Sequence, residues 1–375
     1  MRAASRSNAR CACLTELTSN NSMNNGFAAT DAASARNVPL RVALLLGGDS
    51  SERAISIKTG QAMRAALNEL NFQVTTFDVG QVVPGESVPD TTFVAWSDLA
   101  ATLRESGFDV VLPALHGGWG EDGTLQSLLE IAALPYVGTP PRGSMIAMDK
   151  QLCKLLMREE GLFVPGGVTI EDENAAPPFE GACVVKPNKG GSSVGVSILK
   201  NTSDANAWRA ALQTALSDGG AALVEETIEG VEITAPVVGE GDQARALPLI
   251  EVVPQSAGGF YDFEAKYASG GSQHLIPPRL SETVQKRISE HALAAHRILG
   301  CRGVSRSDFI VTPDGTAYFL EINTLPGMTE TSLVPDAARA AGISFPQLIE
   351  MLLKSALPHQ SSTRFQPKVA VGETV

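Results

Sequence analysis

Apolar and polar residues alternate along the chain in two periods, one typical of buried strands and the other of helices. The run from Arg41 to Leu46 indicates a buried strand, and the segment after it repeats apolar residues at the spacing of an amphipathic helix. Strand and helix patterns then continue to alternate, which predicts an α/β unit built on a parallel sheet. Its further expected elements are strands at 72–78 and 109–112 and helices at 98–105 and 124–132.

The rest of the chain shows mixed patterns that predict smaller α+β units, so we expect a multidomain protein of α/β and α+β class. One group contains helices at 144–160 and 204–216 and strands at 182–186, 194–199 and 221–226. The next group contains a strand at 232–238, an irregular loop at 255–273, a helix at 282–299, a hairpin over 303–323, and helices at 335–341 and 345–356.

Composition divides the chain further. Residues 1–38 are rich in Ala, Ser, Asn and Arg without a sustained apolar period, so this extension is expected to be disordered. The polar stretch 359–375 is expected to form a flexible tail. Between them we predict an N-terminal α/β domain at 39–140, a central unit at 141–230, and a C-terminal unit at 231–358 that carries an omega-type loop at 255–273.

Charge and cysteine content argue against several classes of protein. The 29 basic and 41 acidic residues give a net charge of -12, which would repel a nucleic-acid backbone. No stretch approaches the roughly 20 apolar residues that a membrane-spanning helix needs. The five cysteines are scattered and odd in number, which does not fit a disulfide framework and agrees with a reducing cytoplasm.

The hairpin over 303–323 carries the most informative side chains. If its turn lies at Thr312–Gly315, counting outward pairs Asp308 with Phe319 and Arg306 with Glu321. Alternation then gathers two carboxylates, an amide and a guanidinium on one face, and such hard oxygen ligands suit Mg²⁺ held together with nucleotide phosphates. A solvated face with an ordinary Arg–Glu pair is the alternative. The expected ligand face is Arg306, Asp308, Glu321 and Asn323, and the expected core face is Phe309, Val311, Tyr318, Leu320 and Ile322.

A glycine- and serine-rich loop, K-P-N-K-G-G-S-S-V-G from Lys186, joins two expected strands. Glycines let backbone N–H groups approach phosphate oxygens and lysines add positive charge, so the loop is a candidate phosphate cradle. It is not a Walker A loop, because no G-x-x-x-x-G-K-[ST] occurs. The loop also satisfies G-x-S-x-G, which would make Ser193 the nucleophile of a hydrolase, but the residues after it alternate like a strand rather than a helix. A plain hairpin turn is the third alternative.

Two further loops follow strands of the first unit. G-G-D-S-S-E begins at Gly47, and H-G-G-W-G-E-D-G-T begins at His116. Both would open at the carboxyl edge of a parallel sheet, where ligands bind. Alone, the glycine pair fits a common strand-to-helix turn, and His116 fits a capping or core histidine equally well.

Taken in order, these segments resemble the D-alanine:D-alanine ligases along nearly the whole span from Arg41 to Leu357. The resemblance implies an ATP-grasp fold preceded by a parallel-sheet α/β domain, so that 39–140 would bind substrate and the two later units would be the ATP-grasp subdomains. The strings that carry it are G-G-D-S-S-E-R-A-I-S from Gly47, H-G-G-W-G-E-D-G-T from His116, M-D-K ending at Lys150, V-K-P-N-K-G-G-S-S-V-G from Val185, E-E-T-I-E-G-V-E from Glu225, F-Y-D-F-E-A-K-Y from Phe260 and E-I-N-T-L-P-G-M-T from Glu321.

The resemblance also implies roles for matching residues. ATP would be bound by Lys150, Lys186, Ser193, Glu225, Glu226, Ile228, Glu232 and Lys266, and magnesium by Asp308, Glu321 and Asn323. The first D-alanine would be held by Glu52, in a hydrogen-bonded set with Ser192 and Tyr267, and by His116. The oxyanion would be stabilised by Arg306 and the Gly327 N–H, and the second D-alanine would lie against Ser332 and Leu333.

The implied reaction joins two D-alanine molecules to D-alanyl-D-alanine, a peptidoglycan precursor, through a D-alanyl phosphate, and releases ADP and phosphate. Two Mg²⁺ ions, for which Mn²⁺ would substitute, and several lysines would offset the repulsion between carboxylate and γ-phosphate. Residues 258–273 are expected to form a lid that excludes water from the acyl phosphate. The family also implies a cytoplasmic homodimer that neither binds nucleic acid nor inserts into membranes.

Acceptor choice rests on fewer residues. Tyr267 matches family members that make the dipeptide, which favours D-alanine over D-lactate. Three positions depart from many relatives, namely Lys189, Gly190 and Thr227, and they put nucleotide affinity in doubt. The alternatives are an ATP-grasp ligase for another acceptor, such as D-lactate or D-serine, a non-catalytic nucleotide-binding module, and the serine hydrolase.

Overall fold

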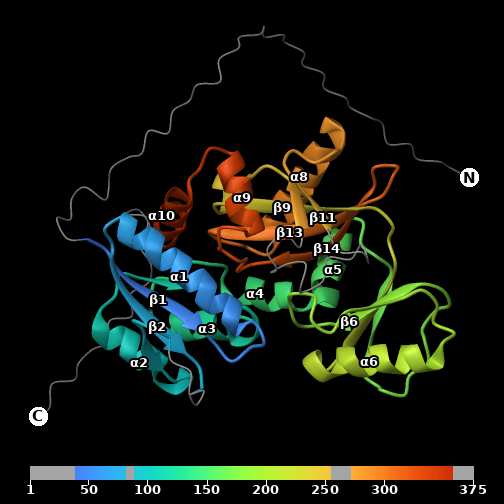
Figure 1. Ribbon diagram of the computed structural model, residues 1–375, viewed down its shortest axis with the longest axis horizontal. Coiled ribbons are helices and arrows are strands. Elements are labelled where there is room, and N and C mark those ends of the chain that lie inside the picture. The colour runs from blue at the N-terminus through green and yellow to red at the C-terminus, as the bar shows by residue number, and fades with distance from the viewer. Residues whose placement is uncertain (1–38, 82–87, 255–271, 358–375) are drawn as a thin grey trace, which may run out of the picture. The chain divides into compact units, whose positions relative to one another are not determined.

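The computed structural model describes residues 39–81, 88–254 and 272–357 (Figure 1). The predicted disordered extension, the predicted tail from 359 and residues 255–271 of the predicted omega-type loop lie outside this part of the chain. Within it the strands form three sheets, one parallel and two antiparallel, with helices packed on them. This is the predicted mixture of α/β and α+β units. The domain boundaries given above stay a prediction.

The first sheet is parallel, in the order β3-β2-β1-β4. Its central strand β1 is apolar along nearly its whole length because both faces are covered: Leu44 and Leu46 pack in one core cluster, and Ala43 and Leu45 in another. Helix α1 covers the face of Leu46 (Figure 1). The elements are β1 (Arg41–Gly47), α1 (Arg53–Glu69), β2 (Gln73–Val79), β3 (Thr92–Val94), α2 (Trp96–Ser106), β4 (Val110–Pro113), the 3₁₀ turn η2 (Gly118–Gly120) and α3 (Thr124–Ile131).

The helix predicted at 144–160 is two helices, α4 (Pro141–Met148) and α5 (Lys150–Glu159). The chain is extended at Asp149, with φ -86° and ψ 96°, and the Asp149 carboxylate accepts the N–H of Leu152 at 3.0 Å. A capped second start therefore replaces the expected continuous helix. The carboxylate also accepts the side-chain amide of Asn188 at 2.9 Å, which ties α5 to the Gly/Ser loop.

The second sheet is antiparallel, in the order β5-β8-β6-β7, and α6 covers one face through Trp208 and Leu212 (Figure 1). The strand predicted at 194–199 begins only at Ser197. Positive φ angles at Ser192 and Ser193 start a tight turn, closed by a hydrogen bond from Val194 N to Gly191 O at 3.1 Å. A second hydrogen bond, from Val196 N to Ser193 O at 3.4 Å, continues the turn through the first residues expected to be strand. The elements are β5 (Gly167–Ile170), β6 (Cys183–Pro187), β7 (Ser197–Leu199), α6 (Ala205–Gly219) and β8 (Ala222–Glu226).

The third sheet runs β12-β11-β9-β13-β14, with β10 paired to β9. Helix α8 packs on it through Ile288, Ala292 and Ala295. Strand β12 begins at Ser272, so the last two residues of the loop predicted at 255–273 are strand. The elements are β9 (Val231–Val238), the 3₁₀ turn η3 (Gly241–Gln243), β10 (Arg245–Ala246), β11 (Ile250–Pro254), β12 (Ser272–Leu275), α8 (Glu282–Ile298), β13 (Val304–Val311), β14 (Ala317–Asn323), α9 (Leu333–Ala340) and α10 (Phe345–Ala356).

The register predicted for the β13–β14 hairpin was wrong. The turn is closed by Thr312 N donating to Thr316 O at 3.0 Å, one residue later than expected, and a β-bulge adds Leu320 to β14. Asp308 therefore pairs with Glu321, not Phe319, and Arg306 pairs with Asn323, not Glu321. The predicted ligand face survives both shifts, but part of the core face does not: Phe319 and Ala317 are buried, whereas Tyr318 and Leu320 are half-buried.

Because of the bulge, the neighbouring side chains of Phe319 and Leu320 differ in burial, and this difference can be tested. Phe319 is fully buried and meets the ring of Phe309 edge to face at 5.6 Å. We expect Phe319→Ala to lower the free energy of unfolding by about 3–5 kcal/mol, because it leaves a cavity, and Leu320→Ala by less than about 2 kcal/mol. Urea unfolding followed by circular dichroism measures both. Equal losses would contradict the bulged register.

Two expectations about the chain as a whole concern membranes and disulfides. No helix among the described residues is long and apolar enough to cross a membrane. Cys153, Cys183 and Cys301 are buried and free, and burial raises the pKa of the Cys153 and Cys301 thiols to about 12. The described cysteines are therefore thiols, and Cys11 and Cys13 lie outside the described residues.

Candidate active site

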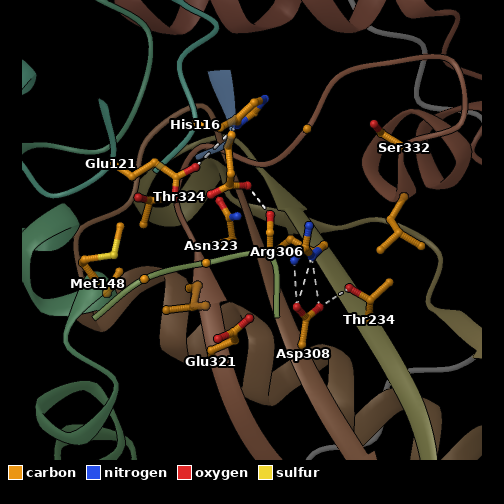
Figure 2. Close-up of a pocket in the computed structure, with 18 of the residues that line it drawn as sticks. His116, Glu121, Met148, Thr234, Arg306, Asp308, Glu321, Asn323, Thr324 and Ser332 are labelled. Carbon is orange, nitrogen blue, oxygen red and sulfur yellow. Dashed lines mark hydrogen bonds and ion pairs between the residues drawn. The ribbon is translucent and has the colours of Figure 1, made fainter. Parts of the chain in front are cut away.

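The four polar residues of the hairpin line one pocket (Figure 2). Arg306 and Asp308 project from β13, and Glu321 and Asn323 project from the neighbouring β14. The guanidinium of Arg306 donates two hydrogen bonds to Asp308, from Nε at 3.0 Å and from Nη2 at 2.8 Å. The face predicted from alternation is therefore assembled, although by a different register.

Thr234 is part of this group and was not predicted. It lies on β9 opposite Asp308, is buried, and donates its hydroxyl to Asp308 Oδ1 (Figure 2). The sequence held a signal for it, because alternation along the strand predicted at 232–238 puts Thr234 on the same face as Glu232. Its hydroxyl and Arg306 together fix the orientation of the Asp308 carboxylate.

The donor set fits a hard divalent cation. Asp308, Glu321 and Asn323 offer carboxylate and amide oxygens, which suit Mg²⁺ better than metals that prefer His or Cys. No group of three or more His, Cys, Asp or Glu that would cage a metal occurs within the described ranges. A cation held by two carboxylates and an amide would keep coordination positions for phosphate oxygens.

A second and larger cavity of about 580 Å³ adjoins this pocket. Part of its wall is apolar, formed by Val184, Ile198, Ile310 and Leu320, and its size suits a ligand as large as a nucleotide. Every described residue predicted to bind ATP lines it, namely Lys150, Lys186, Ser193, Glu225, Glu226, Ile228 and Glu232. The predicted Lys266 lies outside the described residues.

Two lysines and a carboxylate lie at the base of this cavity. Lys186 Nζ is 2.6 Å from Glu225 Oε2, and Lys154 contacts the other carboxylate oxygen. Burial alone would raise the pKa of Glu225, but the adjacent Lys186 and Lys154 hold it below its usual value. Burial alone would lower the pKa of Lys186, and Glu225 raises it above its usual value. Both groups are therefore charged, and Lys154 was not predicted as a site residue.

The first sheet contributes the other side of the smaller pocket. Glu52, buried at the start of α1, accepts a hydrogen bond from Ser192 Oγ, as the resemblance implied. A Cβ built on Gly191 would lie 3.0 Å from Glu52 Oε2, so glycine is what allows this approach. The predicted third member of the set, Tyr267, lies outside the described residues.

His116 lies in the same pocket, also buried (Figure 2). Its Nε2 is 2.9 Å from Thr59 Oγ1, and its Nδ1 is 3.5 Å from Glu121 Oε1. Glu121 was not predicted as a site residue, although it belongs to the string that begins at His116. It faces both His116 and the pocket, so it orients the imidazole.

The segment after β14 closes the smaller pocket. Gly327, Ser332 and Leu333 line it, with Leu333 opening helix α9. Ser332 Oγ accepts the N–H of Thr329 at 2.9 Å. The smaller cavity measures about 90 Å³, which suits amino-acid-sized ligands. It shares with the larger cavity a wall formed by Lys150, Gly190, Gly191, Glu232, Asp308 and Glu321.

Comparisons with known proteins identify the family of the chain. A family model described as D-ala D-ala ligase N-terminus matches residues 41–139, and one described as D-ala D-ala ligase C-terminus matches 172–354. The D-alanine–D-alanine ligase of Pelotomaculum thermopropionicum is 42% identical over 330 residues, which cover 85% of this chain and 97% of that protein. That of Gluconobacter oxydans is 43% identical over 321 residues, covering 85% and 99%.

Solved structures give the same result. The D-alanine–D-alanine ligase of Bacillus anthracis complexed with ATP has a TM-score of 0.66 at 28% identity and covers 84% of this chain and 96% of its own. The VanG D-Ala:D-Ser ligase of Enterococcus faecalis has a TM-score of 0.69 at 28% identity, covering 85% and 100%. Fold and site together define an ATP-dependent ligase of the ATP-grasp class. The chain belongs to the D-alanine–D-alanine ligase family.

Proposed function

We propose that this chain joins two D-alanine molecules to D-alanyl-D-alanine at the expense of ATP, as a step of peptidoglycan precursor synthesis. The single observation that carries this proposal is the wall shared by the two cavities, in which Asp308 and Glu321 separate a nucleotide-sized space from an amino-acid-sized one. A carboxylate bound on one side and a triphosphate bound on the other would meet at this wall. Membership of the ligase family supports the same reaction.

In the first half-reaction the carboxylate of one D-alanine attacks the γ-phosphate of ATP. Glu52 binds the ammonium of that D-alanine, and His116, oriented by Glu121, faces its carboxylate. Lys150 and Lys186 contact the phosphates. Magnesium bound by Asp308, Glu321 and Asn323 would neutralise charge on the phosphate oxygens. These groups together reduce the repulsion between the two anions, and the products are D-alanyl phosphate and ADP.

In the second half-reaction the amine of the other D-alanine attacks the acyl carbon, and phosphate leaves. Gly327, Ser332 and Leu333 line the part of the pocket where the acceptor would bind. Negative charge develops on the former carbonyl oxygen, and the guanidinium of Arg306 with the Gly327 N–H stabilises it. Arg306 is preorganised for this role by its two hydrogen bonds to Asp308.

One specific observation favours a second acceptor. The structure with a TM-score of 0.69 is that of a D-Ala:D-Ser ligase, and it covers as much of this chain as the D-alanine–D-alanine ligase does. D-Serine is therefore the alternative acceptor. We also infer that the enzyme acts in the cytoplasm, which the free buried cysteines support, and as a homodimer, which rests on the family resemblance alone.

Release of ADP, measured by a coupled assay on the purified full chain, tests the proposed function. We expect release with D-alanine, Mg²⁺ and ATP at a rate at least about 100-fold above that with L-alanine, because a pocket that pairs several polar groups with one enantiomer leaves them unpaired with the other. D-Serine and D-lactate are offered as acceptors beside D-alanine, and the products are identified by mass spectrometry. Absence of ADP release with every amino acid would refute the ligase, and a mixed D-alanyl-D-serine product would favour the second acceptor.

A further inference from the structure

Lys154 is a buried cation that none of the steps above uses. It lies one helical turn after Lys150 on α5, and its side chain is only 3% exposed. Its ammonium contacts Glu225 on one oxygen while Lys186 contacts the other at 2.6 Å. Lys154, Lys186 and Glu225 therefore form a lysine–carboxylate cluster of two cations and one anion at the base of the larger cavity.

Burial raises the free-energy cost of protonating Lys154, the second lysine of the cluster. Desolvation, and then repulsion by Lys186, lower the pKa of Lys154 to about 7, although Glu225 and Glu321 oppose the shift. A single lysine would already neutralise Glu225, so Lys154 is not needed to satisfy that carboxylate. A buried charge held at such a cost calls for a compensating anion, and the larger cavity beside Lys186 is where an anion has access.

The net charge of the cluster determines whether the ammonium of Lys186 is available to a phosphate. Without Lys154, the carboxylate of Glu225 would pair with Lys186 alone, and the pair would have no net charge to offer a phosphate. When Lys154 is protonated, Glu225 is shared, and the cluster has a net positive charge that faces the cavity through Lys186, which lines it while Lys154 does not. Desolvated charge pairs of this kind are stronger than those at the surface.

We propose that Lys154 is a positioning residue for ATP, which shares the carboxylate of Glu225 and so leaves the ammonium of Lys186 available to the phosphates. The inference rests on the proposed nucleotide-binding function of the larger cavity. In this proposal Lys154 does not contact the substrate. It affects the phosphates only by sharing Glu225 with Lys186.

Isothermal titration calorimetry of the full chain with ATP and Mg²⁺ tests it. Lys154→Met is expected to raise the Kd for ATP about tenfold, the effect of one charge-assisted hydrogen bond, while kcat at saturating ATP and the KM for D-alanine change by less than about twofold. In Lys154→Met/Glu225→Gln, Lys186 no longer faces an unshared carboxylate, so the Kd should stay within about threefold of the value for Glu225→Gln alone. Glu225→Gln alone completes the cycle.

Two further variants separate this proposal from a purely structural role. Lys154→Gln keeps a donor toward Glu225 without the charge and should weaken ATP binding as Lys154→Met does. Arg158→Met removes an exposed charge from the same helix and should leave the Kd unchanged. Undiminished ATP binding by Lys154→Gln, or a loss on Lys154→Met that is equally large in the Glu225→Gln background, would overturn the proposal. Failure of the wild-type chain itself to bind ATP would instead overturn the proposed function.

Discussion

Replacement of Glu321 with glutamine is expected to lower kcat by at least about a thousandfold, or about 4 kcal/mol of transition-state stabilisation. Glutamine keeps the size of the side chain and one oxygen but removes the negative charge that would attract a divalent cation. Glu321 also lies 3.6 Å from Lys150 Nζ across the wall that both cavities share. The variant should therefore fold normally and fail in catalysis.

The measurement is ADP release over a series of Mg²⁺ concentrations, with folding checked by circular dichroism. Higher Mg²⁺ is expected to restore part of the lost rate, because the remaining proposed ligands Asp308 and Asn323 would still bind the ion weakly. Glu290→Gln is the matched control, since Glu290 is exposed on α8 and its ion pair with Lys286, at 3.9 Å, lies at the surface. Wild-type turnover by the Glu321 variant would remove the metal role and favour a nucleotide-binding module without catalysis.

Replacement of Arg306 with lysine is expected to lower kcat by about 100- to 1,000-fold, the range found when one oxyanion donor is removed. Lysine keeps the positive charge but lacks the planar fork that donates to Asp308 from Nε and Nη2. Because the proposed role of Arg306 is to stabilise the oxyanion of the second half-reaction, ATP binding should change far less than turnover does.

A rapid-quench experiment with D-alanine and ATP separates the two half-reactions. One equivalent of ADP should still form quickly in Arg306→Lys, whereas the dipeptide should appear slowly. Arg287→Lys serves as control, because Arg287 is exposed and donates only to the Gly315 carbonyl among the described contacts. If ADP and dipeptide slow down equally, Arg306 acts before the acyl phosphate forms, and its assignment to the oxyanion is wrong.

Much of the fold was predictable because alternation and helical spacing are strong, local signals. Strand β1 and helix α10 follow the predicted limits closely. The errors occur where a single residue shifts the pairing of two strands or interrupts a helix. The bulge at Leu320 and the later closure at Thr316 depend on backbone conformations that many sequences adopt, and the break at Asp149 depends on a contact with Asn188, which is distant along the chain.

The predictions of site residues also divide into those that the sequence allowed and those that it did not. Glu52 could be found because its string is specific, and Asp308 because strand alternation puts it on the polar face of the hairpin. The structure brings both to one pocket. Thr234, Glu121 and Lys154 were not singled out, because each acts through a contact with another side chain that becomes visible only in the folded structure. A threonine in a strand or a lysine on a helix has no sequence signal for a functional role. The role becomes visible only when the fold places a carboxylate beside it.

The wall common to the two cavities also has a consequence for ligand design. A compound that carries an amino-acid mimic at one end and a nucleotide mimic at the other could occupy both spaces at once, joined across Asp308 and Glu321. Tethering makes the second contact intramolecular, at an effective concentration on the order of millimolar for a short linker. Such a bivalent inhibitor would have a far lower Kd than either half alone.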